Sequence, residues 1–455
     1  MIRMRLSQAA QAINATLCGA DVEFCGVSTD TRSLQTDNLF VALTGPHFDA
    51  HDFLAQAHGK GAAAAMLNNA ASDALPVLVV ADTRASLARL AAHWRRQFTV
   101  PVIAVTGSNG KTTVKEMIAA IFNQIGPTLV TQGNLNNDIG LPLTLLRLDA
   151  SHRFAVIEMG ANHPGEIAHL TAITRPNVAL INNAGPAHLE GFLTLAGVAR
   201  AKGEIFAGLA TQGTAILNAD DVFSGLWREL IGDQRCLSFG LEAPADVSAH
   251  WKMHDDGSQL ELHTPAGDIA IRLPLPGRHN VMNALAASAA ALAAGAGLNE
   301  IKRGLEAIQP VKGRLQIKSG LHGTRIIDDT YNANPGSLGA ALEVLASSPD
   351  ATWLVLGDMA ELGDDAGALH EAAGQQALAA GIDRLFTVGE FSRRAAQQFG
   401  SSARHFVTQD ELIAGLRDEL NAAQPFAVSV LIKGSRSAGM ERVVAVLTVP
   451  PAGES

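Results

Sequence analysis

One glycine-containing segment has the residue types that bind phosphate. Thr106-Gly107-Ser108-Asn109-Gly110-Lys111-Thr112-Thr113 lies between a short β-branched run, 102–105, and a segment of helical periodicity, 111–124. Backbone N–H groups of such a turn converge on an anion, and the amino terminus of the helix adds positive potential. Lys111 can reach the β- and γ-phosphates of a nucleotide, and the Thr112 hydroxyl can bind Mg²⁺. Val105 stands where the general pattern has a glycine, but the strand–turn–helix context still predicts phosphate binding.

Metal ions around a triphosphate would need further ligands, and three residues are candidates. Glu158 directly follows the strand-like run 154–157, and His188 lies a few residues past the run 178–181, so both are expected at the ligand edge of one parallel sheet. A carboxylate and a neutral imidazole there can bind metal ions. Spacing alone nevertheless favours a capped loop with a hydrogen-bonded histidine. Lys202, in Ala201-Lys202-Gly203-Glu204, is on the same grounds expected to be a solvated helix lysine.

The second half of the chain contains further polar candidates. His279, Asn280 and Asn283 begin an alanine-rich helix, where they either contact a nucleotide or cap the helix. Arg314 could place a guanidinium against transferred phosphoryl charge, although spacing alone favours a linker arginine. The run 328–335 holds the only tyrosine of the chain and follows a buried strand, which predicts a ligand loop. The segment 433–436 is a weaker candidate of the same kind.

The chain divides into three sections with different residue patterns, and these sections position the candidate residues. Residues 1–82 have short mixed elements with a polar turn at 28–32, and residues 83–313 alternate strands and helices before a period-two stretch at 247–274. Residues 314–455 repeat strand then helix several times. The expected fold is therefore α/β, with a small mixed amino-terminal domain, a central P-loop-type domain with a mostly parallel sheet, and a Rossmann-like doubly wound carboxyl-terminal domain.

Composition excludes several classes of protein. The chain has 455 residues with a net charge of −10 and 47% hydrophobic residues, so it can bury large cores and is not built to neutralise nucleic-acid phosphates. Its three cysteines are too few for a disulfide framework. The first residues do not resemble a signal peptide, and the most apolar run, 281–298, is typical of a buried helix. We therefore expect a cytoplasmic protein without membrane insertion.

Taken together, these motifs resemble the Mur ligase family over essentially the whole chain. The phosphate loop includes the family's early glycine, and the other motifs fall in the family's order: 158–162, 187–192, 201–205, 277–283, Arg314 and 328–335. Segments 133–142, 331–335 and 356–363 resemble the member that joins D-alanyl-D-alanine to UDP-N-acetylmuramoyl-tripeptide, which completes the cytoplasmic pentapeptide precursor of peptidoglycan. The sibling that adds the third residue usually has an arginine after Asp-Asn-Pro, which Asn334-Pro335-Gly336-Ser337 lacks.

The resemblance implies a role for each group of residues. Lys111, His188, Lys202 and Arg314 would be catalytic, ATP would bind 107–113 with His279, Asn280, Asn283, Arg314 and Asp329, and Mg²⁺, as two ions, would be held by Thr112, Glu158, His188 and Lys202. Lys202 is typically carbamylated in this family. The resemblance further implies that the substrates contact the following residues: Ser28, Thr29, Asp30, Arg32, Asn134, Asn136, Tyr331, Asn332 and Asn334.

Other hypotheses remain open at this point. A sibling ligase that adds a single amino acid, meso-diaminopimelate or lysine, is the nearest. A P-loop NTPase without ligase activity would hydrolyse ATP without an acceptor, and a nucleotide-binding module without catalysis would leave the many candidate ligands unused. We expect a monomer whose partners are small molecules. The identity of the tripeptide's third residue does not follow from the sequence.

Overall fold

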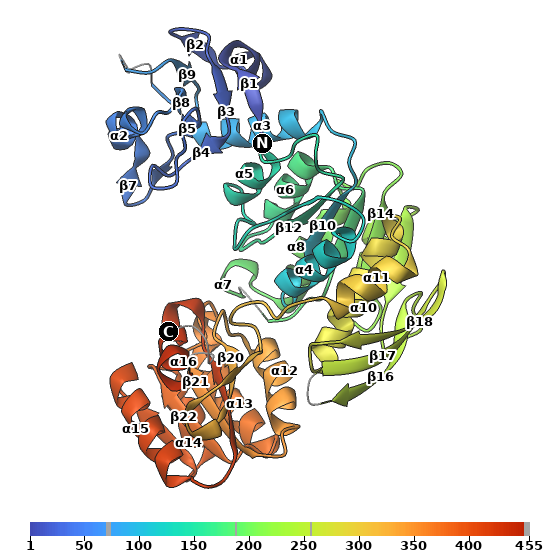
Figure 1. The fold of residues 1–455 in the computed structure, drawn as a ribbon, viewed down its shortest axis with the longest axis vertical. Coiled ribbons are helices and arrows are strands. Elements are labelled where there is room, and N and C mark those ends of the chain that lie inside the picture. The colour runs from blue at the N-terminus through green and yellow to red at the C-terminus, as the bar shows by residue number, and fades with distance from the viewer. Residues whose placement is uncertain (70–73, 187–188, 255–256, 450–455) are drawn as a thin grey trace.

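The structure is a computed structural model that describes residues 1–69, 74–186, 189–254 and 257–449. Three groups of strands follow one another along an arc, with the amino-terminal part at one end and the carboxyl-terminal part at the other (Figure 1). The predicted boundaries after residues 82 and 313 fall between these sheets and stay a prediction. No described helix has the length and apolar character needed to cross a membrane.

The amino-terminal part is a small mixed α/β unit. Its five-stranded sheet has the order β2-β9-β8-β5-β4, parallel except for the β2–β9 pair. Two short antiparallel pairs, β1–β3 and β6–β7, flank it. The elements are β1 (Arg3–Arg5), α1 (Leu6–Ile13), β2 (Thr16–Cys18), β3 (Glu23–Cys25), β4 (Val27–Ser28), β5 (Leu39–Val41), β6 (Thr44–Gly45), β7 (Phe48–Asp49), η1 (Ala50–Phe53), α2 (Leu54–Gly59), β8 (Ala64–Leu67) and β9 (Val77–Val79).

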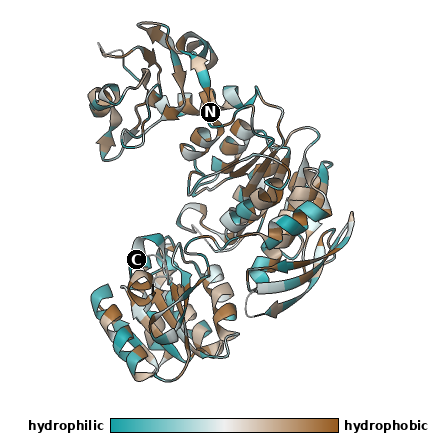
Figure 2. Cartoon of the chain, in the orientation of Figure 1, coloured by the Kyte–Doolittle hydropathy of each residue, from teal (hydrophilic) through white to brown (hydrophobic). Residues whose placement is uncertain are grey.

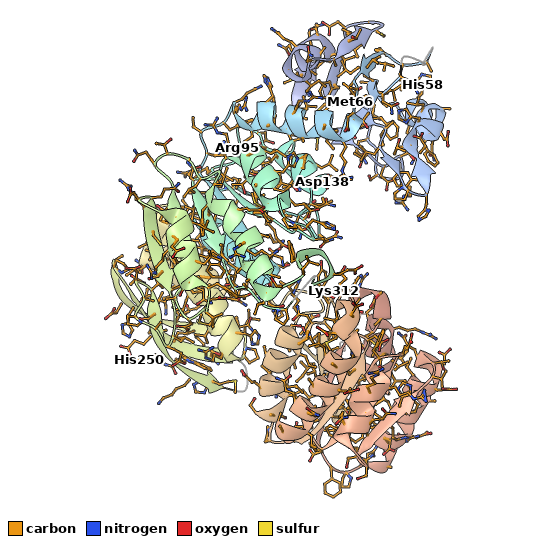
Figure 3. The ribbon with its side chains drawn as sticks, turned by 180° about the vertical axis from the view of Figure 1, so that it is seen from behind. His58, Met66, Arg95, Asp138, His250 and Lys312 are labelled. Carbon is orange, nitrogen blue, oxygen red and sulfur yellow. The ribbon has the colours of Figure 1, made fainter. Side chains whose placement is uncertain are left out.

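Helix α3 (Thr83–Arg95) connects this unit to the central part and packs against both. Asp82 caps its amino terminus by accepting a hydrogen bond from the Ala85 N–H at 3.0 Å. At the other end, the buried Arg95 donates to the carbonyls of Thr174 and Phe98 at 3.0 and 2.7 Å. Figure 3 labels Arg95 on this helix. One continuous apolar core therefore joins the two parts through α3.

The central sheet is entirely parallel, as predicted, and has the order β11-β12-β10-β13-β14-β15. Its strands alternate between two apolar cores, because successive side chains point to opposite faces. Figure 2 shows these strands as apolar. The elements are β10 (Val102–Thr106), α4 (Lys111–Phe122), β11 (Thr128–Val130), α5 (Gly140–Leu145), β12 (Phe154–Glu158), α6 (Glu166–Thr174), β13 (Val178–Ile181), α7 (Leu189–Phe192), α8 (Leu195–Gly203), η2 (Glu204–Phe206), β14 (Thr214–Asn218), α9 (Ser224–Ile231) and β15 (Arg235–Phe239).

The period-two stretch forms the expected antiparallel excursion, and the alanine-rich run is a buried helix as predicted. The three-stranded sheet β16 (Ser248–His254), β17 (Gly257–Thr264) and β18 (Gly267–Leu273) shares the second core with α10 (Arg278–Ala293) and α11 (Leu298–Glu306). The helix α10 packs against α4, the central strands β13 to β15 and the small sheet, so nearly all of its side chains are buried.

The carboxyl-terminal sheet is doubly wound, with the order β19-β20-β24-β21-β22-β23, and only the β19–β20 pair is antiparallel. Helices cover both faces, and Lys312 lies at the connection to the central part (Figure 3). The elements are β19 (Gln316–Ser319), η3 (Leu321–Gly323), β20 (Arg325–Asp329), α12 (Pro335–Ala346), β21 (Ala351–Gly357), η4 (Gly363–Asp365), α13 (Ala366–Ala379), β22 (Arg384–Val388), α14 (Ser392–Phe399), β23 (Ala403–Phe406), α15 (Gln409–Ala422), β24 (Val428–Lys433), η5 (Arg436–Ala438) and α16 (Glu441–Leu447).

Candidate active site

A cleft of about 980 Å³ lies between the central and carboxyl-terminal sheets. Its walls are the loops that follow β10, β12, β13 and β14 on one side and β20, β21 and β24 on the other, so both sheets present their carboxyl ends to it. Most residues predicted for the site line this cleft: Ser108, Asn109, Gly110, Lys111, Thr113, Asn134, Asn136, Glu158, His279, Asn280, Asn283, Arg314, Asp329, Tyr331, Asn332 and Asn334.

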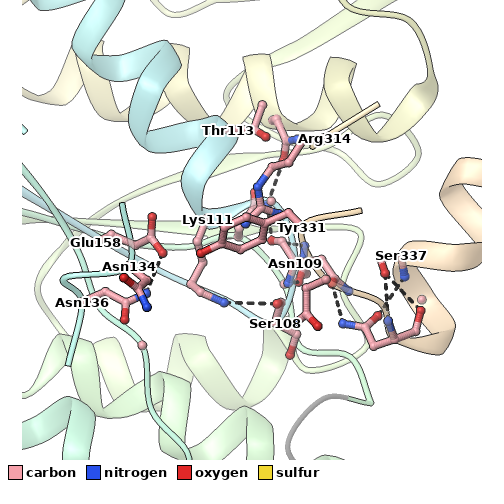
Figure 4. A pocket seen from close by; sticks show the side chains of 18 of the residues that line it. Ser108, Asn109, Lys111, Thr113, Asn134, Asn136, Glu158, Arg314, Tyr331 and Ser337 are labelled. Carbon is pink, nitrogen blue, oxygen red and sulfur yellow. Dashed lines mark hydrogen bonds between the residues drawn. The ribbon is translucent and has the colours of Figure 1, made fainter. Parts of the chain in front are cut away.

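The predicted phosphate loop is a tight turn between β10 and α4. Gly110 has a φ of +78°, and a Cβ there would lie 2.4 Å from the amide atoms of Asn182 and Asn283, so only glycine fits. Lys111 turns back onto the loop and donates to the carbonyls of Gly107 and Ser108 at 2.7 and 3.1 Å (Figure 4). Burial lowers the pKa of the Lys111 ammonium. The lysine therefore lies at the loop, and an incoming phosphate would compensate its burial.

Two asparagines that the sequence reasoning missed hold this loop in place. Asn182 donates to the Asn109 carbonyl at 2.9 Å and to Asn283 Oδ1 at 2.9 Å, while Asn183 Oδ1 accepts from the Asn109 N–H at 2.8 Å. Both directly follow the buried strand β13, the neighbour of β10 in the sheet. The rule that ligand loops follow parallel strands could have identified them.

Glu158 ends β12 inside the wall of the cleft. Its Oε1 accepts from the Asn136 amide at 2.8 Å, and Lys115 Nζ lies 4.0 Å from its Oε2. That Oε2 is buried and accepts no hydrogen bond in the part of the chain that the structure describes. A buried carboxylate oxygen without a donor is costly in a protein, but it is a good ligand for a hard cation such as Mg²⁺.

Lys202 is not the solvated lysine that its spacing alone predicted. It is 1% exposed on α8, beside the ring of Phe192 at 5.5 Å, and it does not itself line the cleft. Burial, together with the nearby Lys111, lowers the pKa of its ammonium to about 7. Lys202 therefore loses its proton far more readily than an exposed lysine. His188, the other predicted ligand of this group, lies outside the described residues.

The three polar residues at the start of α10 do not share one role. His279 is half-buried, its buried Nδ1 has no partner among the described residues, and desolvation lowers its pKa to about 4, so its imidazole is neutral at physiological pH. The Asn280 amide donates to the Pro276 carbonyl at 2.8 Å, so it holds the segment before α10 but does not cap the helix, whose free N–H groups would need an acceptor. Asn283 accepts from Asn182, as described above. Of these three residues, His279 is therefore the best candidate for a hydrogen bond to a nucleotide, through its Nδ1.

The carboxyl-terminal part contacts the phosphate loop directly. Arg314 donates to Thr112 Oγ1 at 3.1 Å and lies over the ring of Tyr331 at 4.3 Å, so it is not a free linker residue. Asn334 donates to Asn109 Oδ1 at 2.8 Å (Figure 4). Arg314 Nε is buried without a partner among the described residues. Two loops distant in sequence therefore meet where a γ-phosphate would lie.

Residues predicted for the far end of a substrate lie elsewhere. Ser28 donates to the Asp30 carbonyl at 2.9 Å, and Arg32 pairs with the Asp30 carboxylate at 2.7 Å, an ion pair that lowers the pKa of Asp30. Neither these residues nor Thr29 line the cleft. Gly107 and Thr112 also lie behind its lining. Of the residues predicted to contact the substrates, Asn134 and Asn136 do line the cleft.

A parallel sheet with the predicted phosphate loop faces a Rossmann-like unit across a cleft, an arrangement that fits an ATP-dependent ligase, and comparison with known families agrees. Residues 105–291 match the Mur ligase middle domain, and residues 313–436 match the Mur ligase, glutamate ligase domain. The chain belongs to the Mur ligase family.

Individual relatives narrow this further. The chain is 48% identical over 449 residues to the UDP-N-acetylmuramoyl-tripeptide–D-alanyl-D-alanine ligase of Escherichia coli, covering 98% of this chain and 99% of the relative. It resembles a crystal structure of MurF from Acinetobacter baumannii with a TM-score of 0.94, 40% identity and 98% coverage of both chains. It also resembles the MurF ligase of Thermotoga maritima in complex with ADP, with a TM-score of 0.82, 27% identity, and coverage of 92% of this chain and 96% of that one.

Proposed function

We propose that this protein uses ATP to join D-alanyl-D-alanine to UDP-N-acetylmuramoyl-tripeptide, forming the pentapeptide precursor of peptidoglycan and releasing ADP and phosphate. The observation that carries this proposal is the contact across the cleft, where Arg314 and Asn334 meet the phosphate loop. The most similar relatives reported above are ligases of this specificity. The sibling that adds 2,6-diaminopimelate shares only 20% identity, with a TM-score of 0.55.

The chemistry follows from the difficulty of joining a carboxylate and an ammonium in water. The tripeptide's terminal carboxylate attacks the γ-phosphorus of ATP, the bond to the β-bridging oxygen breaks, and ADP leaves with that electron pair. Lys111 and Arg314 face this step because two anions must approach one another. The free amine of the dipeptide then attacks the acyl carbon, loses a proton and expels phosphate. The cleft keeps water from the acyl phosphate while it exists.

Mg²⁺ fits the residues present. Glu158 Oε2 offers a buried carboxylate oxygen without a donor among the described residues, and the Thr112 hydroxyl at the start of α4, which accepts from Arg314, has a second lone pair for the ion. When bound, the ion would neutralise charge on the triphosphate. The Asn136 amide donates to the other oxygen of Glu158 and orients the carboxylate. The predicted metal ligand thereby contacts a residue that we predict to bind substrate.

Carbamylation of Lys202 would complete a second ion site. A neutral amine is the form that reacts with carbon dioxide, and burial supplies it by lowering the pKa of Lys202 to about 7. The product would be an anionic oxygen ligand in place of a buried cation. His188 is the predicted companion ligand.

Substrate binding completes the proposal. Asn134, Asn136, Tyr331, Asn332 and Asn334 would contact the peptide and the incoming dipeptide, because all five line the cleft. The polar turn at 28–32 would bind the UDP end, far from the chemistry. We further propose that the protein works as a monomer in the cytoplasm, where its nucleotide substrates are made.

One assay tests the function. Phosphate release is measured with UDP-N-acetylmuramoyl-tripeptide, ATP and either D-alanyl-D-alanine, meso-diaminopimelate or lysine, and we expect turnover with the dipeptide alone. Oxygen-18 in the terminal carboxylate of the tripeptide should appear in the released phosphate. Turnover only with a single amino acid would assign the protein to a sibling, and ATP hydrolysis that ignores all acceptors would assign it to the NTPases.

A further inference from the structure

Lys433 is a fully buried cation that the proposed chemistry does not use. It ends β24 in the middle of the carboxyl-terminal sheet, and its side chain is 1% exposed. In the parallel register its Cα faces that of Asp329 on β20. Burying an ammonium is costly unless the charge is paired and hydrogen-bonded. The partners of the Lys433 ammonium therefore show which segments it fixes in place.

The ammonium of Lys433 ties together both ends of one loop. It forms a charge-assisted hydrogen bond with Asp329 Oδ2 and donates to the Asn332 carbonyl at 3.0 Å. The other carboxylate oxygen of Asp329 accepts from the Leu315 N–H at 3.2 Å. Lys433 therefore fixes the loop after β20 and, through Asp329, the residue that follows Arg314.

The linker that carries Arg314 also contacts this loop directly. The Tyr331 N–H donates to the Gly313 carbonyl at 3.0 Å, and the Tyr331 ring lies under the Arg314 guanidinium. Leu315 has a φ of +49°, a left-handed conformation that a leucine keeps only when its surroundings impose it. The hydrogen bond from Leu315 to Asp329 is one such restraint, so loss of Lys433 would release the linker.

We propose that Lys433 is a positioning residue for phosphoryl transfer, acting through Asp329 and Leu315 to hold Arg314 against the phosphate loop. This proposal rests on the function proposed above for the cleft. The ammonium of Lys433 remains paired with Asp329. The guanidinium of Arg314 contacts Thr112 and, with ATP bound, would contact the transferred phosphoryl group. A small displacement of such a group costs much of the rate, because phosphoryl transfer depends on alignment.

The chain contains a matched control one residue away. Asp328 precedes Asp329 on β20 and pairs with Lys318 at 2.6 Å. Neighbouring side chains on a strand point to opposite faces, and neither Asp328 nor Lys318 lines the cleft. Lys318→Met therefore removes the cation from a carboxylate on the same strand, while the bonds from Lys433 and Leu315 to Asp329 keep both partners.

The test is a double-mutant cycle in the full-length protein with D-alanyl-D-alanine as acceptor. We expect Lys433→Met to lower kcat by about 10- to 100-fold, Lys318→Met to stay within about twofold of wild type, and Lys433→Met added to Arg314→Ala to lower kcat by less than about twofold further. Thermal unfolding and the KM for ATP are measured for each variant.

Each outcome decides the proposal. Multiplicative losses in the double variant, or an equal loss in Lys318→Met, would overturn it, because Lys433 would then act independently of Arg314 or only through the stability of the sheet. Should Lys433→Met fail to fold, the same cycle is run with Lys433→Gln, whose neutral amide keeps a hydrogen-bond donor but removes the charge. Absence of ligase activity in the wild-type protein would instead refute the function proposed for the cleft. That outcome is distinct from failure of the proposal for Lys433, which is judged only from the variants of an active protein.

Discussion

Lys111 is the residue whose chemistry could be inferred most directly, because its place between a strand and a helix defines what it can do. Its ammonium is half-buried and donates to the carbonyls of Gly107 and Ser108, which are weak substitutes for phosphate oxygens. Lys202 shows the opposite case. Only burial turns it from an ordinary lysine into an amine with a pKa of about 7.

Lys111→Ala should abolish ligation while the protein stays folded. Removing one pre-placed cation from a developing anionic transition state costs about 100- to 1,000-fold in kcat. The core around α4 does not depend on the lysine, so the midpoint of thermal unfolding should change little. Phosphate release and differential scanning fluorimetry measure the two quantities, and normal turnover by this variant would contradict the role of the loop.

Lys202 predicts a dependence on pH and carbon dioxide. Below pH 7 the amine is increasingly protonated and cannot react with carbon dioxide, while above pH 7 it is neutral and can. Enzyme dialysed free of carbon dioxide should therefore lose activity and regain it on addition of bicarbonate, more completely at pH 8 than at pH 6. A carbamate signal in the carbon-13 NMR spectrum of the labelled wild type, absent from Lys202→Ala, would identify the modified residue. Full activity without carbon dioxide would exclude the modification.

At the scale of elements, one residue serves two structures at once. Asn334 caps α12 by accepting from the Ser337 N–H at 2.9 Å, and the same amide donates to Asn109 of the phosphate loop at 2.8 Å. The start of α12 in the carboxyl-terminal part is thereby connected to the predicted phosphate loop of the central part. The cap could be expected from Asn-Pro before a helix, but the second bond could not.

The two roles of Asn334 can be separated by substitution. Asn334→Asp keeps an acceptor for the cap but loses the amide donor, so we expect wild-type stability and a raised KM for ATP. Asn334→Ala loses both, and should also destabilise the protein by about 1 kcal/mol. Urea unfolding and steady-state kinetics measure the pair, and an unchanged KM in Asn334→Asp would show that the bond to Asn109 has no part in nucleotide binding.

At the scale of the whole molecule, the amino-terminal and central parts share a core and the carboxyl-terminal part has its own. Helix α3 buries Leu87 and Leu90 in the shared core, whereas the carboxyl-terminal sheet packs into two separate clusters. The first two parts should therefore lose structure together. The carboxyl-terminal part is connected to them mainly through the linker and the polar contacts of the cleft.

Leu90→Ala tests this division. Truncating a fully buried leucine costs about 2–5 kcal/mol, and the loss should appear in both parts that share the core. Proteolysis in increasing urea, followed by mass spectrometry, should show cleavage rising together in residues 1–82 and 102–239. Leu385→Ala, equally buried in the carboxyl-terminal sheet, should affect only that sheet. Independent loss of the amino-terminal part in Leu90→Ala would show that α3 does not couple the two.

The sequence by itself determined the α/β class, the parallel central sheet, the antiparallel excursion and the turn between β10 and α4 that we predict to bind phosphate. Each of these depends on local periodicity or on a turn whose glycines are adjacent to the residues they serve. The remaining candidate site residues could not be ranked from their spacing. The resemblance to the Mur ligases supplied the reason to select them. Asn182 and Asn183 stand at the same sheet edge but were missed, because an asparagine after a strand is also ordinary loop composition.

Only the tertiary structure decided burial and pairing between distant segments. It turned Lys202 into a buried amine, placed Glu158 Oε2 without a donor, and brought Arg314 and Asn334 onto a loop more than two hundred residues earlier in the chain. It also paired Lys433 with Asp329 across neighbouring strands. The physical reason is that desolvation and hydrogen-bond geometry depend on where other segments pack, and local sequence carries no record of those neighbours.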